Sequence, residues 1–590
     1  MRFKYFFVFV LMAGFWLYSC SDDFLEQPPR GAYSAASLAN SKGVEGLLIA
    51  TYAALDGSWF ESWGNNNFNQ VGGASNWVWG SIRAEDSYKG TESTDFVDLN
   101  PVERYEVQPS NPTLTNKWNG SFDGIGKANE TLRTLALAED ITDADRTRIT
   151  AEARFLRGHF HFEAKKTFGN PPYIDETVVD FSAVTNDVDI WPMIEADFLF
   201  AFENLPGTMG AAGRANKWAA AAYLGKTYMY QGKWAEAKGM FDQVISNGTT
   251  ASGAALALMP NYHDNFDAQK ESGNTEVLFA YESSAAGDIV NGNYENTLNQ
   301  PHGSSTQGAG CCGFFQPSQN MVNSFKVDAN GLPMPDTYND VDVPDDEGLA
   351  SDEPFTPTDI ALDPRLDWTV GRRGIPYLDW GVHPGFNWIR NVPNGGPYSP
   401  IKNVASVAEL DANLAGTYDW GFALTAQNVT IIRLADVMLL AAEAEAELDN
   451  LPRALELVNM VRMRAANPNG FVKKSDGTPA ANYQIGMYNS FGSKADALKA
   501  IRFERKLELG MEGQRFFDLV RWDNLTESGK TGLAFDIAEY LNDYLAGEND
   551  RQHLANASFQ EKHKYAPIPE SVITQSTVNG VENIKQNQGF

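Results

Sequence analysis

One short pattern constrains the fold of this chain more than any other. It combines small and aromatic residues at the L-G-x₂-Y…A-x₃-F spacing of a tetratricopeptide repeat: Leu224, Gly225, Tyr228, Ala237 and Phe241. In such a repeat, small residues let two antiparallel helices approach closely, and the rings fill the space beside them. A turn is supplied by residues 231–233. The pattern predicts a helical hairpin over residues 217–245 and a mostly α fold.

Other stretches also have helical periodicity. Residues 142–168 begin with a capping-box-like pair, Thr142 and Asp145, and end at Gly169 before two prolines. Residues 431–465 are rich in Ala, Glu and Leu and are interrupted at 449–450, and a further helix is predicted from 494 to about 511. Ala442 and Ala454 stand twelve apart, like Gly225 and Ala237, which indicates a second, degenerate repeat.

Residues 56–117 and 250–430 have a different texture. Gly, Pro, Asn and Asp are frequent there, and aromatic residues lie among turn formers. We predict one domain over residues 20–590, a helical repeat scaffold with long irregular loops and a few short strands. Its parts are an N-terminal helical part (21–250), an irregular ligand-binding part (251–430) and a C-terminal helical part (431–590). Binding residues are commonly placed on such loops.

The start of the chain has the features of an export signal. Arg2 and Lys4 precede an apolar run over residues 5–18, which is shorter than the roughly 20 apolar residues that span a bilayer. We predict a signal peptide over residues 1–19. Residues 17–20 resemble a lipobox, so Cys20 is the predicted lipidation site, and acidic residues 21–26 resemble the surface-export signal of Bacteroidetes lipoproteins. The alternative is a soluble periplasmic protein with an incidental cysteine.

Charge excludes one class of partner. The chain has 590 residues and a formal net charge of −30, from 46 Lys and Arg against 76 Asp and Glu. Nucleic-acid-binding proteins present basic surfaces that neutralise phosphates, and no Lys/Arg-rich run occurs here. We therefore exclude DNA and RNA as partners.

The three cysteines and seven histidines form no metal-ligand motif, so we expect no cofactor.

Several blocks along the chain, taken together, resemble the SusD/RagB family. The blocks occur in the expected order: ARFLR (153–157), FGNPP (168–172), DPRL (363–366), FERKLEL (503–509), EGQR (512–515), DLVRW (518–522), APIP (566–569) and QNQGF (586–590). The resemblance implies a tetratricopeptide scaffold held by a lipid anchor on the outer leaflet of the outer membrane. It also implies a glycan ligand, a TonB-dependent, SusC-like transporter as partner, and no catalysis. Because the loops vary within the family, ligand residues cannot be transferred by motif.

Aromatic residues in the irregular stretches are the candidate glycan-binding residues. One group follows Trp59 and Trp63, the other lies near residue 390, and together they are Trp77, Trp79, Arg83, Asp86, Trp380, Phe386, Trp388, Arg390 and Tyr398. Sugar rings stack on aromatic planes, and Arg, Asp and Asn hydrogen-bond to hydroxyls. We expect some of these rings to be exposed. The alternative is that they form small cores that fix the loops.

Two carboxylates, Glu508 and Glu512, lie one helical turn apart and have the residue types of a glycosidase pair. Arg505 stands three residues before the first and Arg515 three after the second, which favours ion pairs along a helix face. We therefore interpret the pair as structural.

Two further features leave alternatives open. Cys311 and Cys312 are adjacent in a Gly-rich loop, where we favour two thiols over a strained vicinal disulfide. Residues 336–347 are rich in Asp and Glu, and we favour a solvated loop over a Ca²⁺ site.

The leading hypothesis is a glycan-binding uptake lipoprotein. The alternatives are a glycoside hydrolase, a tetratricopeptide adaptor for another protein, and an uptake lipoprotein that carries peptides.

Overall fold

The computed structural model describes residues 35–57, 71–284, 292–303, 310–417 and 423–590. The predicted signal peptide, Cys20, Trp59 and Trp63 lie outside these residues. The helices are α3 (Ala35–Leu38), α4 (Ser41–Ala53), α6 (Asn100–Glu103), α7 (Pro112–Leu137), α8 (Asp143–Phe168), α9 (Trp191–Asn204), α10 (Lys217–Gln231), α11 (Trp234–Asn247), α12 (Gln319–Ser324), α13 (Leu366–Thr369), α14 (Val392–Gly395), α15 (Val407–Asp411), α16 (Leu434–Glu447), α17 (Leu451–Ala465), α18 (Lys494–Glu508), α19 (Arg515–Glu527), α20 (Ile537–Gly547) and α21 (Glu570–Gln575).

The strands are short and pair two by two. In chain order they are β1 (Ser87–Gly90), β2 (Val277–Tyr281), β3 (Phe314–Pro317), β4 (Val370–Gly371), β5 (Ser399–Pro400), β6 (Ala415–Thr417), β7 (Ala423–Thr425), β8 (Val429–Arg433), β9 (Thr577–Val578) and β10 (Val581–Glu582). The antiparallel pairs are β1 with β3, β2 with β8, β4 with β5, β6 with β7 and β9 with β10. The predicted class, mostly α with a few short strands and long irregular loops, is confirmed.

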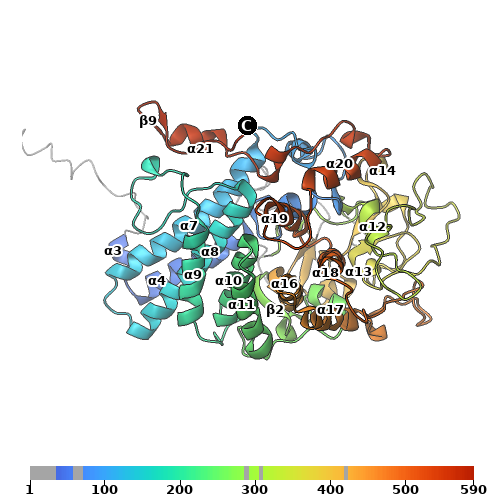
Figure 1. Ribbon diagram of the computed structural model, residues 1–590, viewed down its shortest axis with the longest axis horizontal. Coiled ribbons are helices and arrows are strands. Elements are labelled where there is room, and N and C mark those ends of the chain that lie inside the picture. Colours follow the sequence, from blue (N-terminus) through green and yellow to red (C-terminus); the bar gives the residue numbers. More distant parts are fainter. Residues whose placement is uncertain (1–34, 58–70, 285–291, 304–309, 418–422) are drawn as a thin grey trace, which may run out of the picture.

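The long helices pack in sequence as a repeat scaffold. Helix α7 contacts α8, α8 contacts α9, and the series continues through α10 and α11 to α16, which contacts α17 and α18. Figure 1 shows α7 to α11 standing in a row on one side of the molecule, whereas α12, α13 and α14 lie on the other side among long loops. The largest hydrophobic core lies between the helices of this row and α16.

The predicted helix starts and stops are largely confirmed. Thr142 caps α8 by accepting a hydrogen bond from the backbone N–H of Asp145, and Gly169 ends the helix at φ 71°. Gly232, at φ 66°, makes the turn between α10 and α11. The prediction was wrong at residues 431–433, which form the end of β8 instead of a helix, because they pair with β2.

Position 225 supports the tetratricopeptide assignment. A Cβ added at Gly225 would lie 2.5 Å from Cε1 of Phe241, the aromatic residue of the same repeat. The hairpin therefore depends on the absence of a side chain here, as the spacing predicts. In contrast, a Cβ at Gly239, on the exposed side of α11, would meet nothing within 4 Å.

Gly225→Ala should therefore lower the free energy of unfolding by about 1–3 kcal/mol, because the new methyl group overpacks the helix crossing. The matched variant Gly239→Ala should raise it by roughly 0.5–1 kcal/mol, because alanine favours an open helical position. Urea unfolding of both variants measures the difference. Equal effects of the two substitutions would contradict the repeat assignment.

The irregular half of the chain is closely packed. Side-chain amides bind some of its backbone carbonyls: Asn394 donates to the carbonyl of Gly90 at 2.8 Å, and Asn293 donates to that of Gln427 at 3.1 Å. Within the described part of the chain, every helix is too short or too polar to cross a lipid bilayer.

Candidate functional site

The first predicted aromatic group is buried. Trp77 and Trp79 belong to a π-helical turn (Trp77–Ser81) and are 0% exposed. Their indole N–H groups donate to the backbone carbonyls of Glu295 (3.1 Å) and Val71 (3.0 Å). The turn packs tightly because Gly80 has no side chain: a Cβ there would lie 1.8 Å from the carbonyl oxygen of Gly513. Exposure, which we expected of some candidate rings, was wrong for these two.

The polar members of the first group are also inside the protein. The guanidinium of Arg83 lies 4.0 Å from the ring centroid of Phe516 and donates to the carbonyl of His563. Asp86 accepts a hydrogen bond from the Ser81 hydroxyl at 3.2 Å. Burial, followed by the neighbouring charge of Glu85, raises the pKa of Asp86 to about 7. Neither side chain is accessible to a ligand in this conformation.

The second predicted group is divided between surface and interior. Trp388 and Tyr398 are buried, and Trp380 is half-buried with its indole N–H bonded to the carbonyl of Ala405 at 2.8 Å. Phe386 is 53% exposed. Arg390 is half-buried and pairs with Glu92 (2.8 Å) and Asp95 (2.5 Å).

The structure does not bring the predicted rings together. Trp77 and Trp79 belong to one hydrophobic cluster, Trp380 and Trp388 to another, and Tyr398 to a third. Most of these aromatics therefore form small cores that fix the loops, which is the alternative that the sequence left open. A role of Phe386 and Trp380 in ligand binding remains a prediction.

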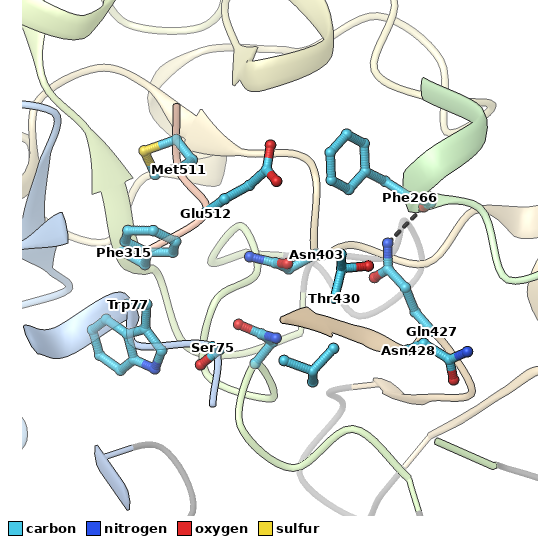
Figure 2. A pocket seen from close by; sticks show the side chains of 12 residues that line it. Ser75, Trp77, Phe266, Phe315, Asn403, Gln427, Asn428, Thr430, Met511 and Glu512 are labelled. Carbon is cyan, nitrogen blue, oxygen red and sulfur yellow. Dashed lines mark hydrogen bonds between the residues drawn. The ribbon is translucent and has the colours of Figure 1, made fainter. Parts of the chain in front are cut away.

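One predicted residue, Trp77, also lines a pocket. The pocket is formed by segments from both halves of the chain, and its lining consists of Ser75, Trp77, Phe266, Asn296, Phe315, Asn403, Gln427, Asn428, Val429, Thr430, Met511 and Glu512. Figure 2 shows the rings of Trp77 and Phe315 on one side, with the amides of Asn403, Gln427 and Asn428 across from them. Its free volume of about 40 Å³ admits ordered water or a hydroxyl group, since one water needs roughly 10–15 Å³.

Several neutral polar groups of this pocket have no partner. Gln427 donates to the carbonyls of Phe266 and Lys402 at 2.6 Å, but its buried Oε1 accepts no hydrogen bond from the described residues. The side chains of Asn403 and Thr430, both half-buried, form no hydrogen bond with any described residue. Buried polar groups are normally satisfied, so the pocket is suited to water or to a ligand that supplies hydroxyl groups.

The one carboxylate in the lining is already neutralised. Glu512 Oε1 accepts from Lys402 (2.7 Å) and Arg433 (2.9 Å), and its Oε2 accepts from Arg433 at 2.9 Å. Although burial raises the pKa of Glu512, these cations outweigh it and hold the pKa below its ordinary value. The described lining of the pocket therefore offers hydrogen bonds without an unpaired charge.

The partners predicted for the two glutamates were wrong, although both residues are structural. Glu508 pairs with Arg365 (3.0 Å), Arg433 (2.7 Å) and Arg464. Glu512 lies beyond the end of α18, in the turn that follows it. Arg505 instead pairs with Asp436 and Asp518, and Arg515 pairs with Glu85.

The environment of this pair does not suit acid catalysis. Burial acts to raise the pKa of Glu508, but three arginines hold it well below its ordinary value. The general acid of a glycosidase needs a raised pKa, so that it carries a proton to the leaving group. Both glutamates remain ionised and fully paired, which is the arrangement of a structural ion network.

The two remaining predictions have different outcomes. Cys311 and Cys312 are joined as a vicinal disulfide, so the preference for two thiols was wrong. Cys312 is buried in the same cluster as Trp77 and Phe315.

In the acidic loop, Asp336 pairs with Lys499, Asp346 with Arg373 and Glu347 with Arg551.

Among the described residues, one carboxylate cluster has metal-ligand spacing, and it lies outside the acidic loop. It consists of Asp523, Glu527 and Glu561. The ammonium of Lys564 pairs with all three carboxylates, at 2.8 Å from Glu527. A metal ion would have to displace this ammonium. The solvated loop over residues 336–347, favoured over a Ca²⁺ site, stays a prediction.

Sequence reasoning missed Asn403, Gln427 and Thr430. They come from a loop, from the residues before β8 and from β8 itself. No motif links them, and single Asn, Gln and Thr residues are common in such segments. Only the tertiary packing identifies them.

Comparisons with known proteins agree with the fold. The family model described as "SusD family" matches residues 275–590, and a second, described as "Starch-binding associating with outer membrane", matches residues 66–229. A SusD-like protein of Bacteroides ovatus is 26% identical over 85% of this chain and 80% of its own length. SusD-like protein P25 of Formosa agariphila is 24% identical over 98% of this chain and 99% of its own length.

Solved structures give the same result for the fold. A SusD-like protein of Bacteroides fragilis superposes with a TM-score of 0.65 at 18% identity, over 96% of this chain and all of that one. Surface glycan-binding protein A of Bacteroides thetaiotaomicron, solved in complex with laminarihexaose, has a TM-score of 0.64 at 19% identity, over 93% of this chain and 99% of its own. At these identities the likeness establishes the architecture.

Proposed function

The chain belongs to the SusD family, and we propose that it captures a neutral glycan outside the cell and delivers it to a TonB-dependent, SusC-like transporter of the outer membrane. Proteins of this family bind glycans and are not enzymes. No catalytic step is therefore assigned to any residue of this chain.

The observation that carries the proposal is the group of unpartnered neutral side chains in the pocket beside Trp77. Gln427 Oε1, the Asn403 amide and the Thr430 hydroxyl face a space whose described lining residues leave no charge unpaired. Glycan hydroxyls donate and accept hydrogen bonds, so they can satisfy all three groups. The small volume indicates that hydroxyl or hydroxymethyl groups of a glycan enter the pocket, while its rings remain at the mouth.

Relatives suggest which glycan to test first. One similar structure is a laminarin-binding SusD-like protein, and another was solved with laminarihexaose. We propose a neutral polysaccharide of this kind as the ligand. A suitable neutral hexasaccharide panel consists of laminarihexaose, maltohexaose, cellohexaose and xylohexaose, with hexagalacturonate as the charged comparison.

Variants of the pocket test this site. Asn403→Ala and Thr430→Val each remove one hydrogen-bonding group that no described residue uses. Each should weaken binding of the best panel member by roughly 2- to 13-fold, the equivalent of about 0.5–1.5 kcal/mol. Titration calorimetry measures the change, with Gln575→Ala, an exposed amide on α21, as the control. Unchanged affinity in both pocket variants would exclude the pocket as the glycan site.

The anchor and the partner are tested together in membranes. Cys20→Ala should release the protein from the outer membrane into a soluble fraction, because acylation at Cys20 supplies the attachment. The acylated protein, extracted with mild detergent, should copurify with a TonB-dependent β-barrel. If the variant stays in the outer membrane, Cys20 is not the anchor; if no such barrel copurifies, the proposed delivery step is wrong.

A further inference from the structure

A recess lies on the surface, and none of its lining residues lines the pocket of Figure 2. It is bounded by residues 329–331, by the chain just after α17 and by residues 483–485. Its volume of about 440 Å³ falls in the range of roughly 300–1,000 Å³ that is typical of small-molecule sites. The pocket beside Trp77, at about 40 Å³, falls far below that range.

Two aromatic rings form one wall of the recess. Phe471 and Tyr483 are half-buried, and their ring centroids lie 5.3 Å apart in an edge-to-face arrangement. The hydroxyl of Tyr483 donates to Asp367 Oδ2 at 2.5 Å, and Asp367 is held in turn by Arg372 at 2.6 Å. This ring is therefore fixed before a ligand arrives, which reduces the entropy lost on binding.

Two loop segments beside the recess also pack closely against each other. A Cβ at Gly486 would lie 2.0 Å from the carbonyl oxygen of Asn330, so the two loop segments approach as closely as glycine allows. The backbone N–H of Gly486 donates to the carbonyl of Gly331 at 2.8 Å, and Arg462 donates to the same carbonyl at 2.9 Å. These contacts fix the shape of the recess.

The polar groups of the lining are neutral amides. Asn330 and Gln484 are exposed, and the described residues that line the recess include no Asp, Glu, Lys, Arg or His. Neutral amides supply donors and acceptors in pairs, which suits vicinal hydroxyl groups. A charged ligand would find no countercharge among these lining residues, whereas an uncharged ligand needs none.

We propose that this recess is a second sugar-binding site, which holds a neutral pyranose unit by stacking on Phe471 and Tyr483 and by hydrogen bonds to the amides of Asn330 and Gln484. The inference rests on the proposed glycan-binding function and adds to it a site separate from the pocket beside Trp77. A glycan chain on this protein would then have two places of contact, one that receives hydroxyl groups and one that stacks a ring.

Hydrogen exchange locates the site directly. The protein is saturated with each neutral hexasaccharide of the panel that it binds. Backbone amides of residues 467–471 and 483–486 should then exchange more slowly than in the free protein. Phe471→Ala should abolish this protection and weaken binding at the recess by roughly 5- to 150-fold, the loss expected for a well-placed aromatic contact. Gln484→Ala should weaken it by roughly 2- to 13-fold. Phe181→Ala, which removes a 55% exposed ring elsewhere, is the matched control.

Two outcomes would overturn the inference, and they are distinguishable. If the wild-type protein binds the panel but residues 467–471 and 483–486 show no protection, or if Phe471→Ala and Gln484→Ala leave that protection unchanged, the recess is not a sugar site and the proposed function stands. If the wild-type protein binds no panel member, the proposed function itself fails. Because the Gln484 side chain is exposed, its variant tests the site even if Phe471→Ala folds poorly.

Discussion

Replacing Arg433 with methionine should lower the free energy of unfolding by about 3–5 kcal/mol, because it removes a buried guanidinium that three carboxylates share and leaves each of them with one counterion fewer. The guanidinium pairs with Glu276 (2.8 Å), Glu508 (2.7 Å) and Glu512 (2.9 Å), and it also donates to the backbone carbonyl of Glu508. The side chain of Arg433 and those of Glu276 and Glu508 are buried. Water cannot replace the lost interactions at these depths.

A matched surface pair provides the control. Lys499 is 43% exposed and pairs with Asp336, which is 70% exposed, at 2.8 Å. Lys499→Met should therefore change stability by less than about 1 kcal/mol. Urea unfolding of both variants, read by two probes to check for a two-state transition, measures the difference. If Arg433→Met costs no more than the surface variant, the buried network does not hold β8 to the end of α18.

Trp77→Ala should be similarly destabilising, at about 3–5 kcal/mol, because it removes a large and fully buried side chain. The ring is 0% exposed, lies 5.6 Å from the ring of Phe315 and donates its N–H to the carbonyl of Glu295. Phe386→Ala removes a ring that is 53% exposed and should have little effect on unfolding. Thermal unfolding of the two variants gives the comparison.

Measuring glycan binding together with the melting temperature also shows whether Trp77 is a core residue or an exposed ligand contact. If Trp77 acts only as a wall of the pocket, Trp77→Ala should weaken glycan binding and lower the melting temperature together. Lost binding with an unchanged melting temperature would contradict the burial described here, because it would mean that the ring is free to stack on a sugar.

The helical half of this protein could be predicted because its determinants are local. The cap at Thr142 involves a residue three positions away, and the contact of Gly225 with Phe241 lies within one repeat. Each of these signals is complete within a short window of sequence. Residues 431–433 show where such signals fail: an apolar run can join a helix or a strand, and only the distant pairing with β2 decides.

The candidate site could not be predicted because its determinants are distant in sequence. Glycine, asparagine and aromatic residues around Trp77 correctly indicated irregular chain, but irregular chain can be exposed or buried. Burial here depends on contacts with residues more than 200 positions away, such as the bond from Trp77 to Glu295 and the fit of Gly80 against Gly513. Similarly, the arginines three residues from Glu508 and Glu512 were available as partners, but more distant arginines bind these glutamates.

The central claim is that this protein binds a neutral glycan and leaves it intact. The most direct measurement is titration of the wild-type protein with the neutral hexasaccharide panel and hexagalacturonate, followed by chromatography of the same samples after prolonged incubation. We expect saturable binding of at least one neutral member, at least tenfold weaker binding of hexagalacturonate, and recovery of the bound oligosaccharide at full length. Absence of binding across the neutral panel, or the appearance of shorter products, would contradict the claim.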